Sequence, residues 1–175
     1  MAIVNVNYNR RLAVLYANRW AYFRNPNFYD FSDVGGDCTN FTSQCLLAGG
    51  AVMNYTPDFG WYYVNSEDRA PAWSSVKYFY DFITQNEGVG PYGAEVSAAM
   101  VRLGDIVQLI TGEEQNFHHT LIVTEINGFI PNINNIYVAA HSYDCACRPL
   151  SSYDIKQARF IHINGIRVDT EADRV

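Results

Sequence analysis

The segment with the clearest chemical signature runs from Gly35 to Leu46, and a cysteine lies at its centre. Two glycines lead to Asp37 and Cys38, where a helical pattern begins that Gly49-Gly50 ends. A thiol in the first turn of a helix lies at the positive end of the helix dipole, which favours the thiolate and lowers the pKa. Backbone N–H groups without partners inside the helix surround such a thiol and can stabilise an oxyanion. The segment therefore predicts a nucleophilic cysteine.

A cysteine nucleophile needs a base to take its proton and a third group to orient that base. The chain offers His118, His119, His141 and His162. Because adjacent strand residues point to opposite faces, only one of the first two can face the thiol. His141 ends the next predicted strand, and His162 lies inside the last one, where we interpret it as a hydrogen-bonded structural residue. The order of cysteine, strand-start histidine and polar residue is that of papain-like enzymes.

Helical and strand patterns occupy different halves of the chain. Apolar residues recur at helical spacing first, and β-branched and aromatic runs separated by Gly, Asn or Pro follow. Helices followed by strands without alternation indicate an α+β domain with an antiparallel sheet. No linker or repeat divides the chain, so one domain over residues 1–175 is predicted, with a polar tail from residue 169. The predicted helices are 9–23, 38–48 and 73–83, and the predicted strands are 103–110, 120–126, 136–140 and 158–163.

Composition restricts the classes of function. The 175 residues are 49% hydrophobic and 15% aromatic, which describes a folded domain, and the net charge of -6 without a basic patch argues against a nucleic acid partner. Peptides, amides and sugars remain. No apolar run approaches the ~20 residues of a membrane span. The first residues lack a secretion signal, which leaves a cytoplasmic protein or the mature domain of an exported precursor.

The four cysteines do not suggest a disulfide framework or a metal site. Cys38 and Cys45 would lie ~10 Å apart along one helix, beyond the ~7 Å between Cα atoms that a disulfide allows. Cys45 shares the apolar helix face and is interpreted as a buried core thiol. Cys145 and Cys147 are interpreted as free thiols. A zinc site made of these two with His141 and Cys38 has poor spacing, so no metal or organic cofactor is expected.

Other residues near these motifs have both structural and functional interpretations. Asp37 either bonds backbone amides around the cysteine turn or caps the helix, and capping is favoured. Aromatic residues between 55 and 73 are candidates to line a groove for sugar or peptide. Among them Trp73 fits a helical core stripe, whereas Trp61 lies between turns and is the candidate substrate-binding residue at the rim.

Several motifs, in order along the chain, together resemble one family. They are Asp37-Cys38-Thr39-Asn40-Phe41 with Ser43-Gln44-Cys45 and Ala48-Gly49-Gly50, then 102–108, His119-Thr120-Leu121-Ile122-Val123-Thr124 and Ala140-His141-Ser142-Tyr143-Asp144; the regions 8–10 and 20–26 add to the likeness. The set resembles the bacterial putative amidase domain family, which belongs with the papain-like cell-wall cysteine hydrolases of the CHAP and NlpC types. The likeness covers roughly residues 8–168.

The resemblance implies an activity and assigns residues to it. It makes Cys38 the nucleophile, His119 the base and His141 the third, orienting residue, with Asp144 as the reserve orienter because a carboxylate suits that role. It implies an α+β, papain-like fold and an amidase or peptidase that acts on peptidoglycan stem peptides, at the cell surface of a bacterium. Two alternatives stay open: an acyltransferase that uses the same thioester, and a cell-wall binding module without catalysis. The bond cleaved and the oligomeric state are not predicted.

Overall fold

An antiparallel sheet of seven strands frames the structure, a computed structural model that describes residues 2–171. The strand order is β1-β7-β3-β4-β5-β6, and β2 pairs with residues 160–167 of β7 along its other edge. This confirms the predicted α+β class with an antiparallel sheet. The strands are β1 (Ile3–Val6), β2 (Gly90–Val96), β3 (Ile106–Thr111), β4 (His119–Ile126), β5 (Ile136–Ala140), β6 (Cys145–Pro149) and β7 (Ile155–Asp169).

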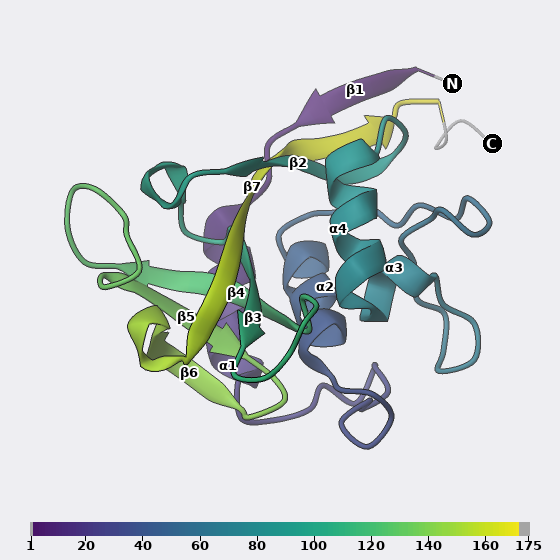
Figure 1. Cartoon of the computed structure of the whole chain (residues 1–175). Coiled ribbons are helices and arrows are strands. Elements are labelled where there is room, and N and C mark those ends of the chain that lie inside the picture. Colours follow the sequence, from purple (N-terminus) through teal and green to yellow (C-terminus); the bar gives the residue numbers. More distant parts are fainter. Residues whose placement is uncertain (1, 172–175) are drawn as a thin grey trace.

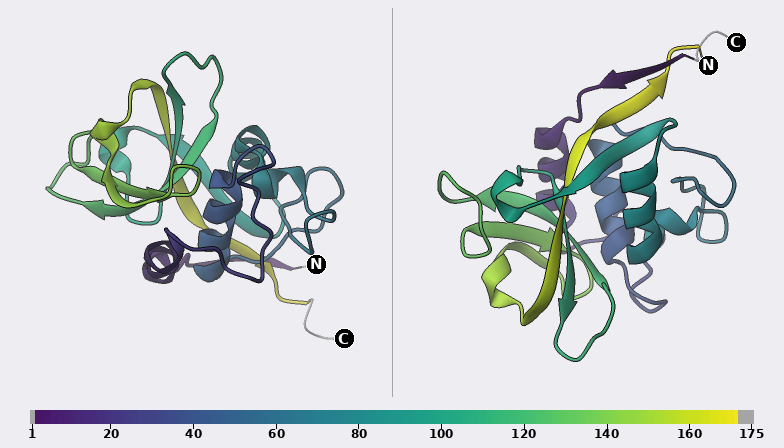
Figure 2. Two further views of the ribbon diagram at one scale, coloured as in Figure 1. Left: turned by 90° about the horizontal axis from the view of Figure 1, so that it is seen from below. Right: turned by 45° about the horizontal axis from the view of Figure 1, so that its top comes forward.

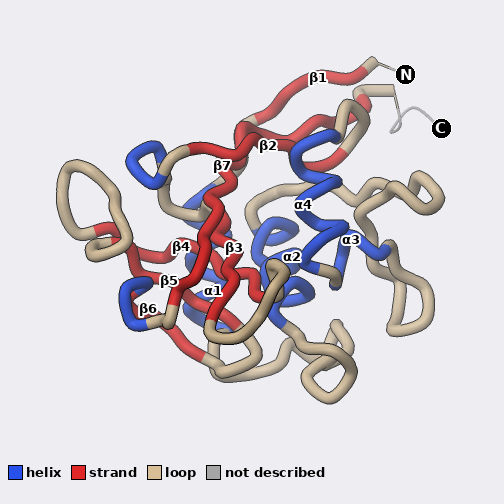
Figure 3. Tube along the Cα trace, in the orientation of Figure 1, coloured by secondary structure: helices blue, strands red, loops and turns tan. Residues whose placement is uncertain are grey.

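Four α-helices precede most of the sheet in the sequence. Figure 1 shows α2, α3 and α4 on one side of β7, while β4, β5 and β6 extend to the other side. Long loops join α1 to α2 and α2 to α3, and Figure 3 shows them in tan. The helices are α1 (Arg10–Trp20), α2 (Cys38–Ala48), α3 (Pro71–Ser74) and α4 (Val76–Gln85), and the 3₁₀ turns are η1 (Ala98–Met100) and η2 (Leu150–Ser152).

Helix α2 runs through the centre of the helical half. Every residue from Cys38 to Leu46 is buried, and the helix packs against α1, α3 and β4. Its polar side chains are buried with partners: Ser43, for example, donates to the Trp73 carbonyl at 2.8 Å. At its C-terminal end, a Cβ on Gly49 would lie 2.3 Å from the ring of Tyr8, so this position requires glycine. The close packing fixes the start of the helix, where the cysteine lies.

Strand β4 separates two hydrophobic clusters because its side chains alternate between the faces of the sheet. Ile122 packs with Phe41 of α2 in the cluster on the helical side. Leu121 and Val123 belong to the cluster on the other side, with Val138 of β5. Each fully buried aliphatic side chain of this kind stabilises the fold by about 1.5–3 kcal/mol. The alternation also determines which face each residue at the start of β4 can reach.

Strand β7 connects the two halves of the sheet, pairing with β1, β2 and β3 along its length. The right view in Figure 2 shows the C-terminal end of β7 beside β1. Beside β7 the buried Asp105 accepts hydrogen bonds from the Arg10 guanidinium at 2.6 Å, from His162 Nδ1 at 2.7 Å and from the Ile163 amide at 3.0 Å. The interpretation of His162 as a structural residue is thus confirmed.

The structure adds three strands that the sequence patterns did not predict, β1, β2 and β6. Strand β2 contains Pro91 and two glycines, residues that are typical of turns. Proline is tolerated there because β2 pairs on one side only, with β7. A Cβ on Gly93 would lie 2.2 Å from the His162 carbonyl oxygen, so glycine is required at this close strand approach. The predicted helix over 73–83 is divided between α3 and α4 at Ser75, which has an extended backbone.

Candidate active site

The predicted nucleophile is the first residue of α2, as the sequence pattern indicates. Gly35 and Gly36 lead into it with φ values of +86° and +104°, a backbone region that strongly favours glycine. The Asp37 amide then donates to Ser142 Oγ at 2.9 Å, which ties this turn to the end of β5. The turn and the helix together hold the Cys38 side chain at the mouth of a pocket.

The carboxylate of Asp37 holds this turn in place but does not cap the helix through a side-chain bond. Its Oδ1 accepts from the Phe31 amide at 2.9 Å and from the Asn40 side chain at 2.8 Å, and its Oδ2 lies 2.5 Å from His141 Nδ1. Asp37 is the N-cap residue of α2, as favoured, but it caps through its backbone carbonyl, which accepts from the Phe41 amide at 2.9 Å. The alternative, in which its carboxylate bonds a backbone amide around the cysteine turn, is also observed.

The Cys38 thiol is buried, with 6% of the residue exposed. Its Sγ lies 3.8 Å from Thr39 Oγ1 and donates weakly to the His118 carbonyl at 4.0 Å. Burial raises the pKa of Cys38, although the backbone amides of Thr120 and Thr39 act in the opposite direction. The sequence predicted a lowered pKa from the helix dipole. In the structure desolvation is the larger effect, so the ligand-free protein holds a thiol.

This thiol gives a testable pH dependence. The unperturbed pKa of a cysteine is about 8.5. We expect the rate of Cys38 alkylation by iodoacetamide to keep rising as the pH exceeds this value, with no plateau between about pH 5 and 8. The reason is that the thiolate is the reacting form and a raised pKa lowers its fraction at neutral pH. Peptide mass spectrometry measures the rate for each cysteine, and the same cysteine in urea-unfolded protein is the reference. A fast plateau below pH 7 would instead show a thiolate–imidazolium pair.

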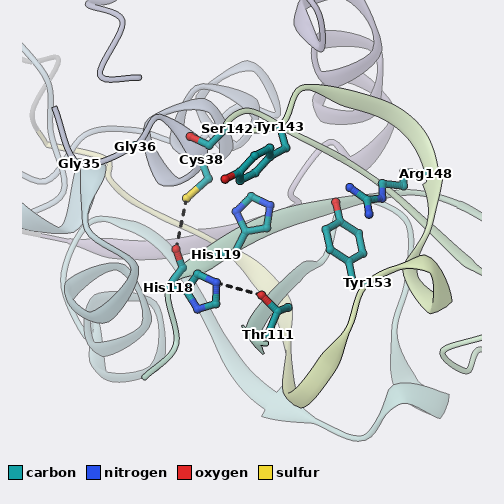
Figure 4. A pocket seen from close by; sticks show the side chains of 10 residues that line it. All are labelled: Gly35, Gly36, Cys38, Thr111, His118, His119, Ser142, Tyr143, Arg148 and Tyr153. Atoms are coloured by element: carbon teal, nitrogen blue, oxygen red, sulfur yellow. Dashed lines mark hydrogen bonds between the residues drawn. The ribbon is translucent and has the colours of Figure 1, made fainter. Parts of the chain in front are cut away.

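His119 begins β4, and its ring lies in the same pocket as the Cys38 thiol (Figure 4). Its Nε2 is buried without a hydrogen-bond partner among the described residues. The ring lies beside the rings of His118 and Tyr153, at centroid distances of 6.5 and 6.0 Å. Burial, assisted by the charges of His118 and Arg148, lowers the pKa of His119 to about 4. The imidazole is therefore neutral at pH 7 and able to accept a proton.

His118 lies just before β4, and its ring also lines the pocket but bonds groups other than the thiol. Its Nε2 lies 3.1 Å from Thr111 Oγ1 and its Nδ1 lies 3.2 Å from the Asn116 carbonyl. Only its backbone carbonyl approaches Cys38 Sγ. The geometry therefore favours His119 over His118 as the partner of the cysteine.

His141 does not orient His119, which corrects the role that the resemblance implied. Its Nδ1 faces the Asp37 carboxylate at 2.5 Å, its Nε2 faces the Trp20 carbonyl at 2.8 Å, and its ring stacks on Phe41. Both ring nitrogens are therefore occupied by Asp37 and Trp20, and neither is free to contact His119. The two histidines lie on different faces of the sheet. His141 packs on the face that α2 covers, whereas His119 lies on the other face, together with Leu121.

Asp144, the reserve orienter, is also bound elsewhere. Its two carboxylate oxygens accept from the Arg24 guanidinium at 2.9 and 3.1 Å. Arg24 also lies 3.2 Å from Asp30 and 3.6 Å from Asp37. Asp144 therefore belongs to a charged network that braces the loop before α2. In the part of the chain that the structure describes, no side chain bonds His119, and the site is a cysteine–histidine pair.

The predicted substrate-binding role of Trp61 is wrong, because its side chain is fully buried. Its indole packs against Trp73 and Phe82, and its Nε1 donates to Ser43 Oγ at 3.0 Å. Trp73 is a core residue, as predicted. The Trp61 ring therefore helps to hold α2 in place through Ser43.

The pocket over the thiol has a volume of about 350 Å³. Figure 4 shows Cys38 and Arg148 on opposite sides of it, with His119 and Tyr153 between them. Sequence analysis missed Arg148 and Tyr153, because β6 and the turn after it carry no regular pattern. Ser142 and Tyr143 form another part of the pocket wall. Their φ values are both positive, 60° and 68°, and no sequence rule predicts this conformation for two consecutive non-glycine residues. The lining residues are Gly35, Gly36, Cys38, Thr111, His118, His119, Ser142, Tyr143, Arg148 and Tyr153.

The remaining cysteines lie outside this arrangement. Cys45 is fully buried and Cys145 is buried, while Cys147 is exposed and donates to Glu125 at 3.0 Å; all are free thiols. Within residues 2–171, no three His, Cys, Asp or Glu side chains lie close enough together to hold a metal ion. None of the helices formed by these residues is long and apolar enough to cross a membrane.

Comparison with known proteins identifies relatives of this chain. The sequence profile of a family described as "Putative amidase domain" matches residues 7–164. The chain is also 34% identical, over 154 residues, to the protein named "Uncharacterized protein YhbB" from Bacillus subtilis (strain 168). The alignment covers 84% of this chain but 45% of that protein, so the chain spans less than half the length of this relative. No solved structure matches the chain significantly.

Proposed function

The chain belongs to the putative amidase domain family, and on that premise we propose that it is a cysteine-dependent amidase or peptidase. The observation that supports this most strongly is one pocket lined by both the first residue of a buried helix, Cys38, and a neutral histidine, His119. These are the two groups that thiol hydrolysis of an amide needs. The proposal includes a papain-like arrangement, in which a cysteine helix packs on a sheet that carries the base.

The proposed reaction proceeds through a thioester. His119 takes the proton of the Cys38 thiol as Sγ attacks the amide carbonyl, and the carbonyl oxygen becomes an oxyanion. Backbone N–H groups in the first turn of α2 stabilise that oxyanion. The C–N bond breaks as His119 gives its proton to the leaving amine. Water, activated by His119, then hydrolyses the thioester, releasing the carboxylic acid and restoring the thiol.

A thiol and a neutral imidazole suit this sequence of steps. The Cys38 thiol has a raised pKa and His119 has a lowered one, so the proton is on sulfur before substrate binds. Proton transfer then accompanies attack, as in serine hydrolases, in place of a preformed ion pair. His141 contributes through Asp37, which fixes the turn that carries the nucleophile.

We propose the peptide part of peptidoglycan as the substrate, because the ordered motifs resemble those of cell-wall cysteine hydrolases. Incubation of the protein with purified peptidoglycan and its soluble fragments, followed by mass spectrometry, tests this directly. We expect new amine and carboxyl ends at one amide bond, together with an acyl adduct on the peptide containing Cys38. Binding to the wall material without new ends would favour the binding module, and products joined to an added amine would favour an acyltransferase.

A further inference from the structure

A second hollow lies on the other side of the Cys38 thiol, with a volume of about 380 Å³. It shares Gly35, Gly36, Cys38 and His118 with the pocket that contains His119. The two hollows therefore meet at the thiol and form one groove. We call them the His119 side and the Arg69 side of the groove. A substrate bound along it would place its reacting carbonyl where the two sides meet.

The charged groups that line this groove are all of one sign. Arg148 lines the His119 side, and Arg69 and Lys77 line the Arg69 side. Among the described residues no Asp or Glu lines either side, although the chain has 18 acidic and 12 basic residues. An acidic protein thus presents positive charge around its candidate nucleophile, and such a groove attracts anions.

Both arginines are held in place by neutral groups. The Arg148 guanidinium lies 3.8 Å from the Tyr153 ring centroid and its Nε donates to Ser152 Oγ at 2.8 Å. Arg69 lies 4.2 Å from the Phe31 ring centroid, donates to Ser74 Oγ at 3.0 Å and also bonds the Ser66 carbonyl.

Neither arginine forms an ion pair within residues 2–171, whereas Lys77 is paired with Asp81 at 2.6 Å. Two oriented guanidinium groups therefore carry uncompensated charge, and guanidinium groups match carboxylates in shape and charge.

We propose that the groove binds an acidic peptide with a carboxylate on each side of the amide bond that is cleaved. This inference rests on the proposed function and names the chemistry of its substrate. His119 lines only one side, and it must protonate the leaving amine, so the amine portion lies toward Arg148. The acyl portion lies toward Arg69. Each guanidinium then binds one carboxylate of the substrate.

Alkylation with two small reagents tests this charge preference without requiring turnover. Iodoacetate carries a carboxylate and iodoacetamide is its neutral counterpart. The ratio of their rate constants at one cysteine cancels the fraction of thiolate, because both reagents meet the same thiolate. Cys147 serves as the internal reference, since it is exposed beside the carboxylate of Glu125. Peptide mass spectrometry at low ionic strength gives both ratios from one sample.

We expect the iodoacetate-to-iodoacetamide ratio at Cys38 to exceed that at Cys147 by about tenfold or more, because nearby guanidinium groups attract the anionic reagent. Arg148→Gln and Arg69→Gln should each lower the ratio at Cys38 by about threefold. Arg11→Gln removes the same charge from the exposed Arg11 and should leave the ratio unchanged. In the unaltered protein, about 0.5 M salt should lower the ratio at Cys38 toward that at Cys147.

The proposal is overturned if the ratio at Cys38 does not exceed that at Cys147, or if it ignores both arginine substitutions. The salt series decides the question in the native protein should either variant fold poorly. These outcomes are independent of the hydrolase proposal. A high ratio with no hydrolysis of any peptidoglycan fragment would retain the anionic groove and remove the proposed activity, while hydrolysis with a low ratio would do the reverse.

Discussion

Replacement of Cys38 with alanine is expected to lower amide hydrolysis by at least about 10⁴-fold, because loss of the nucleophile removes the covalent route and leaves only binding and the oxyanion site. The fold should survive, since the substitution removes one buried sulfur and costs about 1 kcal/mol of unfolding free energy. Steady-state release of amine measures the first effect and urea denaturation the second. The acyl adduct on the peptide containing residue 38 should disappear with the activity.

Cys147→Ala is the matched control for this experiment. It removes an exposed thiol that lines neither side of the groove, and it should leave turnover and the acyl adduct unchanged. Activity that persists in Cys38→Ala, or that is lost equally in both variants, would contradict the assignment of the nucleophile.

Replacement of His119 with glutamine is expected to lower kcat by about 10²–10⁴-fold, the usual contribution of a general acid–base group. In the unaltered protein, kcat/KM should fall as the pH drops through about 4, because His119 has its pKa near 4 and only the neutral imidazole can take the thiol proton. The variant should lack this acid limb. A pH series of kcat/KM for both proteins checks the two effects together.

His118→Gln supplies the control for the neighbouring ring. That side chain bonds Thr111 and the Asn116 carbonyl and does not approach the thiol, so its loss should change kcat far less than the loss of His119. A larger effect at residue 118 would reverse the assignment of the base. An acid limb that remains in His119→Gln would show that another group controls it.

The helical half of the fold can be predicted from the sequence because the local sequence patterns there match the observed helices. The glycine pairs before and after α2 place its ends at Cys38 and Ala48, as observed. Strands β1, β2 and β6 were missed for a different reason. Each is short or interrupted by proline and glycine, and each becomes a strand through its neighbour in the sheet, which local sequence does not specify.

The candidate site likewise has a part that local sequence predicts and a part that it does not. The positions of Cys38 and His119 follow from a helix start and a strand start, which are local features. The partners of His141 depend on which face of the sheet its side chain meets, and that face placed it against Asp37 and away from His119. The direction of the Cys38 pKa shift depends on burial by distant segments, a quantity that helix position alone does not give.

The place of β7 in the sheet has a consequence for synthesis of the protein on the ribosome. Strands β1, β2 and β3 all pair with β7, although residues 155–169 are translated after every other strand. The pairing of β1 with β7 joins Ile3 to Asp169, a contact of long sequence separation that forms slowly. While β7 is still within the ribosome, β1 and β2 have no partner in the sheet, and β3 has one open edge. The nascent chain therefore carries the Cys38 thiol before the sheet beside it is complete.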